Sequence, residues 1–193
     1  NERRKQMTEE QTTLADALVQ EKGLQIVNVI YHESFHEGLV GLIASKLKEK
    51  YHRPFFVFAE GERKGELKGS GRGIDGFHLK KALDTVADLL IKYGGHTKAA
   101  GLSIYIDNLA EFEKRLNELA ESEMDKDDLI KKIYVEIALT PDNLTVELTE
   151  SLEMLEPYGE AFQKPIVGLS NFDIDRVFKM GQNKNHLKLV SSS

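Results

Sequence analysis

The stretch Gly94-Gly95-His96-Thr97-Lys98-Ala99-Ala100-Gly101 decides how the central part of this sequence is interpreted. Its glycine pair allows the backbone to adopt positive φ or to approach a ligand closely, which residues with side chains resist. His96 and Lys98 add a titratable ring and a cation, and the small residues after them keep the following strand thin. This combination suits an anionic ligand. The alternative is an ordinary helix stop, with Gly94 following a helix that ends at Tyr93.

The composition indicates a globular protein with a substantial core. The chain has 193 residues, 40% of them hydrophobic, which is enough for one large or two small domains. No apolar run approaches the roughly 18 residues of a membrane span, so no membrane association is expected. The absence of cysteine excludes disulfides and thiolate metal sites and fits a reducing cytoplasm. Because the first residue is not methionine, we expect a fragment of a longer protein.

Charge is distributed unevenly, although the net charge of −6 taken alone argues against nucleic acid as a partner. Residues 61–98 carry eight Lys and Arg against five Asp and Glu, whereas residues 107–160 carry five against sixteen. Residues 61–101 also contain nine of the fifteen glycines. Cations and flexible backbone therefore share one region, while the acidic segment would repel a phosphate backbone.

Hydrophobic periodicity predicts one α/β domain up to about residue 123. Helices are expected over Glu2–Glu21, Gly38–Tyr51, Phe77–Tyr93 and Leu109–Glu123, and strands over Leu24–Tyr31, Pro54–Ala59, Glu66–Arg72 and Ala99–Ile106. The second helix carries apolar residues at i, i+3, i+4 and i+8, which is typical of a helix that covers a sheet. Together with the strands on either side, it predicts a βαβ-like unit.

A composition shift at Asp125–Asp128 predicts a domain boundary. After it, a strand is expected over Lys132–Leu139, a helix over Leu144–Leu155, and two strands over Pro165–Met180 and His186–Val190 with a turn at residues 181–185. Two strands do not form a stable sheet alone. We therefore expect the sequence to stop within a small β-domain.

Two short motifs match known site patterns but lie in the wrong context. His32-Glu33-Ser34-Phe35-His36 fits the H-E-x-x-H zinc pattern, which requires a helix, yet it follows a predicted strand and precedes a glycine. We expect His36 at a strand end instead, where ligands of α/β sheets collect. Gly71-Arg72-Gly73-Ile74-Asp75-Gly76 fits G-x-G-x-x-G, but the strand before it is too polar for a dinucleotide fold. The glycine-rich backbone of this motif, together with Arg72 and Ser70, still suits a phosphate ligand.

The remaining titratable residues predict no catalytic centre. His52, His78 and His186 lack the spacing of metal ligands and are expected to be surface residues or helix caps. The acidic run from Asp125 to Asp128 is typical of a solvated linker. The sequence pattern does not bring a catalytic base and a nucleophile together.

Three motifs, in the order in which a known family carries them, resemble the domain that accompanies DHH phosphoesterases. Gly94-Gly95-His96 with Ala99-Ala100-Gly101 is similar to its GGHxxAAG signature. Phe35-His36-Glu37-Gly38, with the helix after it, resembles its WHxG segment, and Ser70-Gly71-Arg72 followed by Gly76-Phe77 resembles its S-x-R loop. The sequence departs from the family at three places. Phe35 occupies a position where the family usually has Trp, Gly73 one where Ser is common, and Phe162-Gln163 one where Gly-Asn is typical.

Within that superfamily the chain resembles the RecJ-type exonucleases, which degrade single-stranded DNA from the 5′ end. Asn1-Glu2-Arg3-Arg4 is similar to the end of their interdomain helix, and Leu155-Glu156-Pro157-Tyr158-Gly159 with Pro165 is similar to the entry into their OB-fold. The implied fold is a mixed β-sheet flanked by helices, followed by the start of an OB-fold-like β-domain. The predicted boundaries are 1–22 for the linker helix, 23–124 for the DHH-associated domain, 125–156 for a connector and 157–193 for the partial OB-fold.

The resemblance implies the substrate-binding part of an exonuclease that hydrolyses phosphodiester bonds in single-stranded DNA. Its Mn²⁺ or Mg²⁺ would be bound by a DHH domain upstream, so no catalytic or metal-binding residue is expected in this chain. Single-strand-binding protein or a helicase is an implied further partner. The residues expected to bind DNA are Ser70, Arg72, Gly94, Gly95, His96, His36, Lys98 and Arg4.

Two alternatives remain at this point. The glycine-histidine signature is shared by DHH-type phosphodiesterases of cyclic dinucleotides or short oligonucleotides, and a non-catalytic nucleic-acid-binding module would carry the same features. The segment after Asp125 favours the RecJ-type family over the smaller phosphodiesterases, because those generally end near the position of Glu123.

Overall fold

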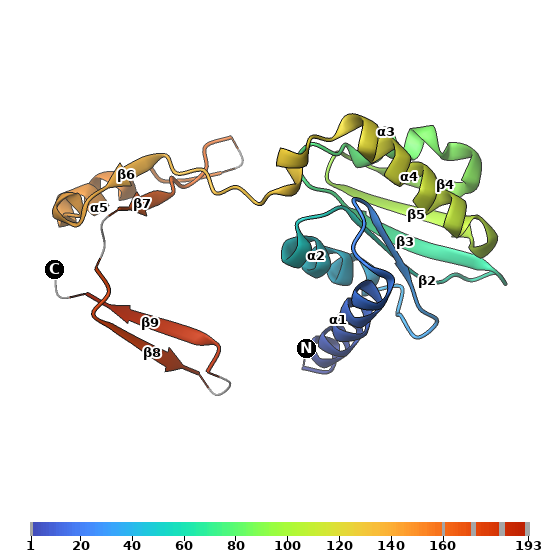
Figure 1. The fold of residues 1–193 in the computed structure, drawn as a ribbon, viewed down its shortest axis with the longest axis horizontal. Coiled ribbons are helices and arrows are strands. Elements are labelled where there is room, and N and C mark those ends of the chain that lie inside the picture. Colours follow the sequence, from blue (N-terminus) through green and yellow to red (C-terminus); the bar gives the residue numbers. More distant parts are fainter. Residues whose placement is uncertain (1, 160, 171–172, 182–183, 192–193) are drawn as a thin grey trace. The chain divides into compact units, whose positions relative to one another are not determined.

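The computed structural model describes residues 2–159, 161–170, 173–181 and 184–191 (Figure 1). The chain divides into two units, Asn1–Lys131 and Lys132–Ser193, which are described separately. None of the described helices combines the length and apolar character that crossing a membrane requires.

A five-stranded mixed sheet with the order β1-β2-β3-β5-β4 organises the first unit. Its strands are β1 (Asn28–Tyr31), β2 (Phe55–Glu60), β3 (Glu66–Arg72), β4 (Leu90–Gly95) and β5 (Ala99–Tyr105). The helices are α1 (Glu2–Lys22), α2 (Val40–Tyr51), α3 (Leu79–Thr85) and α4 (Leu109–Glu123), with 3₁₀ turns η1 (Ala87–Leu89), η2 (Ile106–Asn108) and η3 (Lys126–Leu129). β1 and β2 are parallel and connected through α2, whereas the other pairs are antiparallel. The predicted α/β fold with a mixed sheet is confirmed.

Helices cover both faces of the sheet because the buried strand β2 alternates between two hydrophobic clusters. Phe55 and Val57 pack with residues of α1 and α2. Phe56 and Phe58 point to the opposite face, where both rings meet Phe112 of α4 edge-on, at centroid distances of 5.2 and 6.0 Å. Figure 1 accordingly shows α1 and α2 on one side of the strands and α4 on the other.

The predicted helix Phe77–Tyr93 is wrong in its second half. α3 ends at Thr85, a 3₁₀ turn follows, and β4 forms an antiparallel hairpin with β5. The helical spacing of apolar residues favoured a longer helix, but pairing with β5 gives the backbone of residues 90–95 a hydrogen-bond ladder that overrides this local preference. Gly94 lies inside a strand. The alternative of a helix stop at the glycine pair is therefore wrong as well.

The first strand begins later than predicted, at Asn28 instead of Leu24. The Asn28 side chain closes a turn in front of the strand: its Oδ1 accepts from the Gln25 N–H and its Nδ2 donates to the Gln25 carbonyl, both at 3.0 Å. Asn is favoured in such turns because its short amide can pair with nearby backbone.

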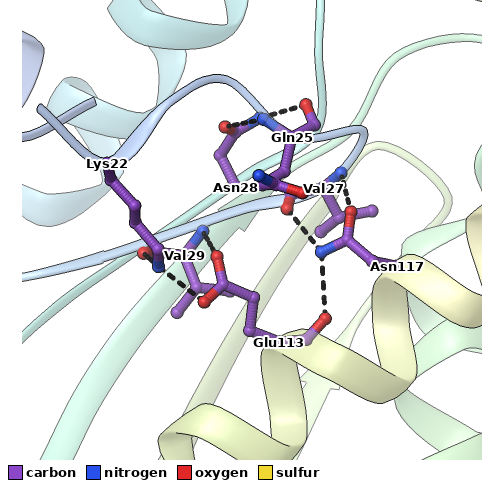
Figure 2. A network of polar contacts seen from close by, with 7 residues as sticks. All are labelled: Lys22, Gln25, Val27, Asn28, Val29, Glu113 and Asn117. Carbon is purple, nitrogen blue, oxygen red and sulfur yellow. Dashed lines mark hydrogen bonds and ion pairs between the residues drawn. The ribbon is translucent and has the colours of Figure 1, made fainter. Parts of the chain in front are cut away.

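The free edge of β1 is capped by side chains, as Figure 2 shows. Asn117 of α4 accepts from the Val27 N–H and donates to the Val27 carbonyl, both at 2.9 Å, so its amide pairs with the backbone as a neighbouring strand would. Glu113 accepts from the Val29 N–H at 3.4 Å, and Lys22 donates to the Val29 carbonyl at 3.1 Å and to Glu113 at 2.5 Å. An open strand edge invites pairing with another chain, and these contacts block it.

Two short sheets and helix α5 (Val146–Glu153) make up the described part of the second unit. β6 (Ile137–Leu139) pairs in parallel with β7 (Val167–Leu169), and β8 (Arg176–Met180) pairs antiparallel with β9 (His186–Val190). The 3₁₀ turn η4 spans Pro141–Asn143.

The second unit corrects two predictions. The expected strand Pro165–Met180 is wrong as a single element, because β7 and β8 pair with different partners. The expected strand Lys132–Leu139 is confirmed only over its last residues, 137–139. Residues 171–172 of the expected strand and residues 182–183 of the expected turn lie outside the described residues.

Candidate functional site

Strand β3 separates a glycine face from a polar face. A Cβ on Gly69 would lie 2.4 Å from a ring carbon of Phe58. A Cβ on Gly71 would lie 2.6 Å from a ring carbon of Phe56. Only glycine therefore allows β3 to lie against these rings. Because side chains alternate across a strand, Ser70 and Arg72 point to the opposite face, toward α2.

Three acceptors orient the guanidinium of Arg72. Its Nε donates to Ser45 Oγ of α2 at 3.1 Å, and its Nη1 donates to Ser70 Oγ and to the Gly71 carbonyl, both at 2.8 Å. Nη2 lies beside Gly41 of α2, where a Cβ would approach it to 2.9 Å. Gly41 thus leaves space beside Nη2, the one guanidinium nitrogen of Arg72 for which no partner is found among the described residues.

The charge of Arg72 is not neutralised: no carboxylate lies within 4.0 Å of it among the described residues. Lys68, on the same face, has the opposite environment. Its ammonium pairs with Glu62 at 2.7 Å and with Glu37 at 3.0 Å. Hydrogen bonds to Glu62 and then Glu37 raise the pKa of Lys68 well above its usual range. An oriented guanidinium without a counter-ion is the stronger anion receptor of the two.

The loop of residues 96–98 lies at the same end of the sheet as Arg72, because Arg72 pairs with Ala99 in the β3–β5 ladder. A backbone bond of 2.9 Å from the Gly73 N–H to the Lys98 carbonyl also ties this loop to the segment that follows β3. Gly95, before the loop, has a φ of +151°, and a Cβ there would lie 2.4 Å from the Ala99 carbonyl oxygen. The position therefore requires glycine.

The side chains of the loop are exposed. Lys98 pairs with Asp75 at 2.7 Å, and both groups are largely in solvent. His96 donates its backbone N–H to the Ala99 carbonyl at 2.8 Å, which closes the hairpin. The structure thus brings the GGH segment and the S-x-R segment together.

Gly94 and Gly101 form an open floor beside Ser70. They face each other in the β4–β5 ladder, and Gly101 also pairs with Ser70 in the β3–β5 ladder. No atom lies within 4 Å of a Cβ built on either glycine. A cavity of about 370 Å³ lies over this floor, with Lys92 and Ser103 also in its lining.

Arg4 and His36 line a different cavity, of about 440 Å³, at the start of α1. His36 Nδ1 accepts from the Gly38 N–H at 3.0 Å, so Nε2 is the ring nitrogen left for a ligand. A third cavity, of about 520 Å³, is lined by both Arg4 and Ser45. Ser45, which holds Arg72, is therefore the link between the two predicted groups of residues.

Two family models match the sequence: the DHHA1 domain over residues 21–122 and the RecJ OB domain over residues 135–193. The chain belongs to the DHHA1 family. The DHHA1 match covers the five-stranded sheet and helices α2 to α4, and the second match covers β6 to β9. The resemblance inferred from the motifs is confirmed.

The chain is similar to curated proteins along most of its length. The chain is 35% identical over 191 residues to the single-stranded-DNA-specific exonuclease RecJ of Bacillus subtilis (strain 168), covering 98% of this chain and 24% of the relative. It is 35% identical over 169 residues to the protein of that name from Escherichia coli (strain K12), covering 83% and 28%. The chain thus spans about a quarter of the length of the curated relatives it matches.

A solved structure agrees in fold over the whole chain. The crystal structure of RecJ in complex with Mn²⁺ from Thermus thermophilus superposes with a TM-score of 0.78 at 26% identity, covering 100% of this chain and 29% of that one. The predicted order, a DHH-associated domain followed by an OB-fold-like domain, is confirmed by this match and the two family models.

The face of the DHHA1 domain that carries Arg72 also contains residues that no sequence motif marks. Ser45 and Gly41 lie within the predicted helix Gly38–Tyr51, and their spacing of four residues places both on the face of α2 that Arg72 contacts. Ser103 and Lys92 had no motif to mark them. Only the ladders β3–β5 and β4–β5, which align both with Lys68, bring them to the cavity.

The described residues of this DHHA1 domain do not fit a metal ion. No group of three or more His, Asp or Glu side chains able to hold one exists among them. In the H-E-x-x-H match, His32 Nδ1 lies 2.8 Å from Ser34 Oγ, and His36 is engaged with Gly38 in a loop. Within the described ranges, neither the zinc pattern nor the Mn²⁺ of related structures therefore has a set of three such ligands.

The G-x-G-x-x-G match forms no dinucleotide site either. β3, which precedes it, is antiparallel to both neighbouring strands, whereas a dinucleotide loop follows a parallel strand. The helix after the motif begins only at Leu79, with His78 as N-cap: its Nδ1 accepts from the Lys81 N–H at 3.3 Å. The prediction that His78 is a surface residue or cap is confirmed.

Proposed function

We propose that this chain holds the DNA strand in a RecJ-type exonuclease that hydrolyses single-stranded DNA from the 5′ end. The observation that carries the proposal is Arg72: its guanidinium is oriented by Ser45 and Ser70, lacks a counter-ion among the described residues, and borders the open glycine floor. Phosphate oxygens are favoured ligands of a guanidinium, and Nη2 still has its N–H groups to donate to them.

In this proposal Arg72 binds one DNA phosphate, with the free N–H groups of Nη2 directed to its oxygens. Ser70 serves as a positioning residue, because its hydroxyl is occupied by Arg72 Nη1. His96 and Lys98 approach the same phosphate or the next one from the loop after β4. Gly94 and Gly95 let the backbone come close to the strand. Arg4 and His36 contact a neighbouring part of the strand.

We propose that the divalent metal ion, Mn²⁺ or Mg²⁺, is bound by a DHH domain outside this chain. Such an ion supplies an activated water for phosphodiester hydrolysis when it is bound. The residues described here bind and orient the strand, which is a separate contribution to the rate. The chain alone is therefore expected to bind DNA and to cleave nothing.

The RecJ OB domain match over residues 135–193 supports this function over that of a cyclic-dinucleotide phosphodiesterase. We further propose a cytoplasmic location, supported by the absence of cysteine. Single-strand-binding protein or a helicase is the partner class that this function implies.

The test measures binding of a fluorescein-labelled single strand by anisotropy across a series of salt concentrations. Arg72→Ala and His96→Ala should each weaken binding, and Arg72→Ala should reduce the slope of log K against log salt by about 0.7, the value for one phosphate contact on a single strand. Lys114→Ala, on the acidic helix α4, is the control of equal charge change. If the Arg72 and His96 variants bind normally while charge reversal within residues 107–123 changes affinity, the strand lies on the other face. Manganese-dependent cleavage by the chain itself would contradict the assignment of the metal to another domain.

A further inference from the structure

We propose that Gly94, Gly101 and Ser103 form a seat for the sugar and base of the nucleotide whose phosphate Arg72 holds. This inference rests on the function proposed above and adds to it the place and chemistry of the uncharged part of the substrate. It follows from the register of three strands and from one buried hydroxyl.

Three rows of residues cross β3, β5 and β4 on the face that carries Arg72. The first contains Arg72 and Ala99, the second Ser70, Gly101 and Gly94, and the third Lys68, Ser103 and Lys92. Successive rows are two residues, or about 7 Å, apart along the strands. A nucleoside joined to a phosphate at Arg72 therefore reaches the second and third rows.

The second row is flat and open. Gly94 and Gly101 lie side by side, and a Cβ on either would meet nothing within 4 Å. The cavity of about 370 Å³ above them is at the lower end of the size range of small-molecule sites. A planar base can lie here directly on peptide groups, because no side chain stands between.

The third row supplies a polar group without a partner. Ser103 is 1% exposed and lines the cavity, and its Oγ has no hydrogen-bond partner among the described residues. A buried hydroxyl left unpaired is unfavourable, and a serine at such a place is explained by a ligand that pairs with it. The hydroxyl can donate or accept, so it suits the edge of a base or a sugar oxygen. Exposed Lys92 flanks it and can turn aside to admit the ligand.

Charge decides that this seat takes a nucleoside and not a second phosphate. Lys68, on the other side of Ser103, is already neutralised by Glu62 and Glu37. Lys68 and Lys92 bring two positive charges to this row and the two carboxylates bring two negative ones, so the row offers a second phosphate no net positive charge. An uncharged base or sugar needs none.

The experiment compares the affinity of the chain for 5′-phosphorylated pentathymidylate with its affinity for an abasic strand of the same length and charge. Wild type should prefer the base-bearing strand by about tenfold, the value of a good hydrogen bond in a closed site. Gly101→Val fills the floor and Ser103→Ala removes the hydroxyl, so each should reduce affinity for pentathymidylate to about that for the abasic strand. Gly159→Val, at another open glycine in the second unit, is the control and should keep the preference.

The melting temperature distinguishes a ligand-binding role of Ser103 from a structural one. Because the Ser103 hydroxyl has no protein partner among the described residues, Ser103→Ala should not lower the melting temperature, whereas loss of a serine needed for the fold would. Equal affinity of wild type for both strands, or a preference that survives in Gly101→Val and Ser103→Ala, overturns the seat while the phosphate site at Arg72 stands. If Arg72→Ala binds both strands as wild type does, the proposed function itself fails.

Discussion

Arg72 Nη1 donates to the hydroxyl of Ser70 at 2.8 Å, across two residues on the same face of β3. Nε of the same guanidinium donates to Ser45 on α2, so a strand and a helix both orient this one cation. The planar fork makes these contacts at once and keeps Nη2 available. A lysine ammonium at this position has neither the planar geometry nor the number of donors.

Arg72→Lys should therefore not preserve function although it preserves charge. We expect its affinity for single-stranded DNA to fall about tenfold, because the contact from Nη2 to the phosphate and the bonds to both serines are lost together. Anisotropy titration at fixed salt measures this. Arg63→Lys, an exposed arginine in the turn between β2 and β3, is the matched control. Equal affinities of Arg72→Lys and wild type would show that charge alone suffices.

Asp75 is paired with Lys98 at 2.7 Å, so in the proposed function it competes with DNA for this ammonium. Asp75→Asn should raise the affinity for single-stranded DNA by about two- to threefold, a small effect because exposed pairs are screened by solvent and salt. The same change at Asp88, which pairs with Arg115 of α4 at 2.8 Å, frees a cation outside the proposed site and should leave affinity unchanged. An equal gain in both variants would mean that net charge, and not Lys98, is responsible.

Gly69 is required by packing, since a Cβ there would lie 2.4 Å from the Phe58 ring. We expect Gly69→Ala to lower the free energy of unfolding of the first unit by about 2 kcal/mol, as overpacking of cores does. Urea denaturation followed by circular dichroism measures it. Gly101→Ala makes the same change on the open face and should stay within about 0.5 kcal/mol of wild type. Similar losses in both variants would show that strand flexibility, not the ring, is the cause.

Asn117 protects the edge of β1 by pairing with both backbone groups of Val27 (Figure 2). Asn117→Ala should lower the free energy of unfolding by about 2 kcal/mol, because a donor and an acceptor are left unpaired. It should also increase self-association, which light scattering detects, since the strand edge becomes open. Glu118→Ala, the neighbouring exposed residue, should do neither. A stable, monomeric Asn117→Ala would contradict the role of the cap.

Asp16 joins α1 to α2 through Lys50, at 2.6 Å, and the Tyr51 hydroxyl, at 2.8 Å. The hydrogen bond from Lys50, followed by that from Tyr51, lowers the pKa of Asp16 below its ordinary value of 3.8, despite partial burial. The carboxylate therefore stabilises the fold above about pH 4, and this contribution is lost as the pH falls through its lowered pKa. Between about pH 5 and 2, wild type should lose more stability in urea titrations than Asp16→Asn does. Parallel pH profiles would contradict this.

The local pattern of the chain was sufficient for the elements whose preference agrees with their surroundings. The stripe of Gly38–Tyr51 and the apolar run of Pro54–Ala59 predicted α2 and β2, because one element buries a single face and the other is buried on both. The three motifs predicted the family, and they marked Ser70, Arg72 and His96 as candidate site residues. Each motif combines a polar side chain with nearby glycines, a combination that few ordinary turns or helix ends require. That these residues bind DNA stays a prediction.

Long-range pairing decided the rest. Residues 90–95 have an apolar spacing that fits a helix, and only the ladder with β5 makes them a strand. The same ladder brings Gly94 beside Gly101 and Lys92 beside Ser103, and packing of α2 brings Ser45 to Arg72. The chain's own pattern thus determined which residues carry charge and where the backbone can bend. Which of them share a face was decided by the tertiary structure, because hydrogen bonds between distant strands carry no local signal.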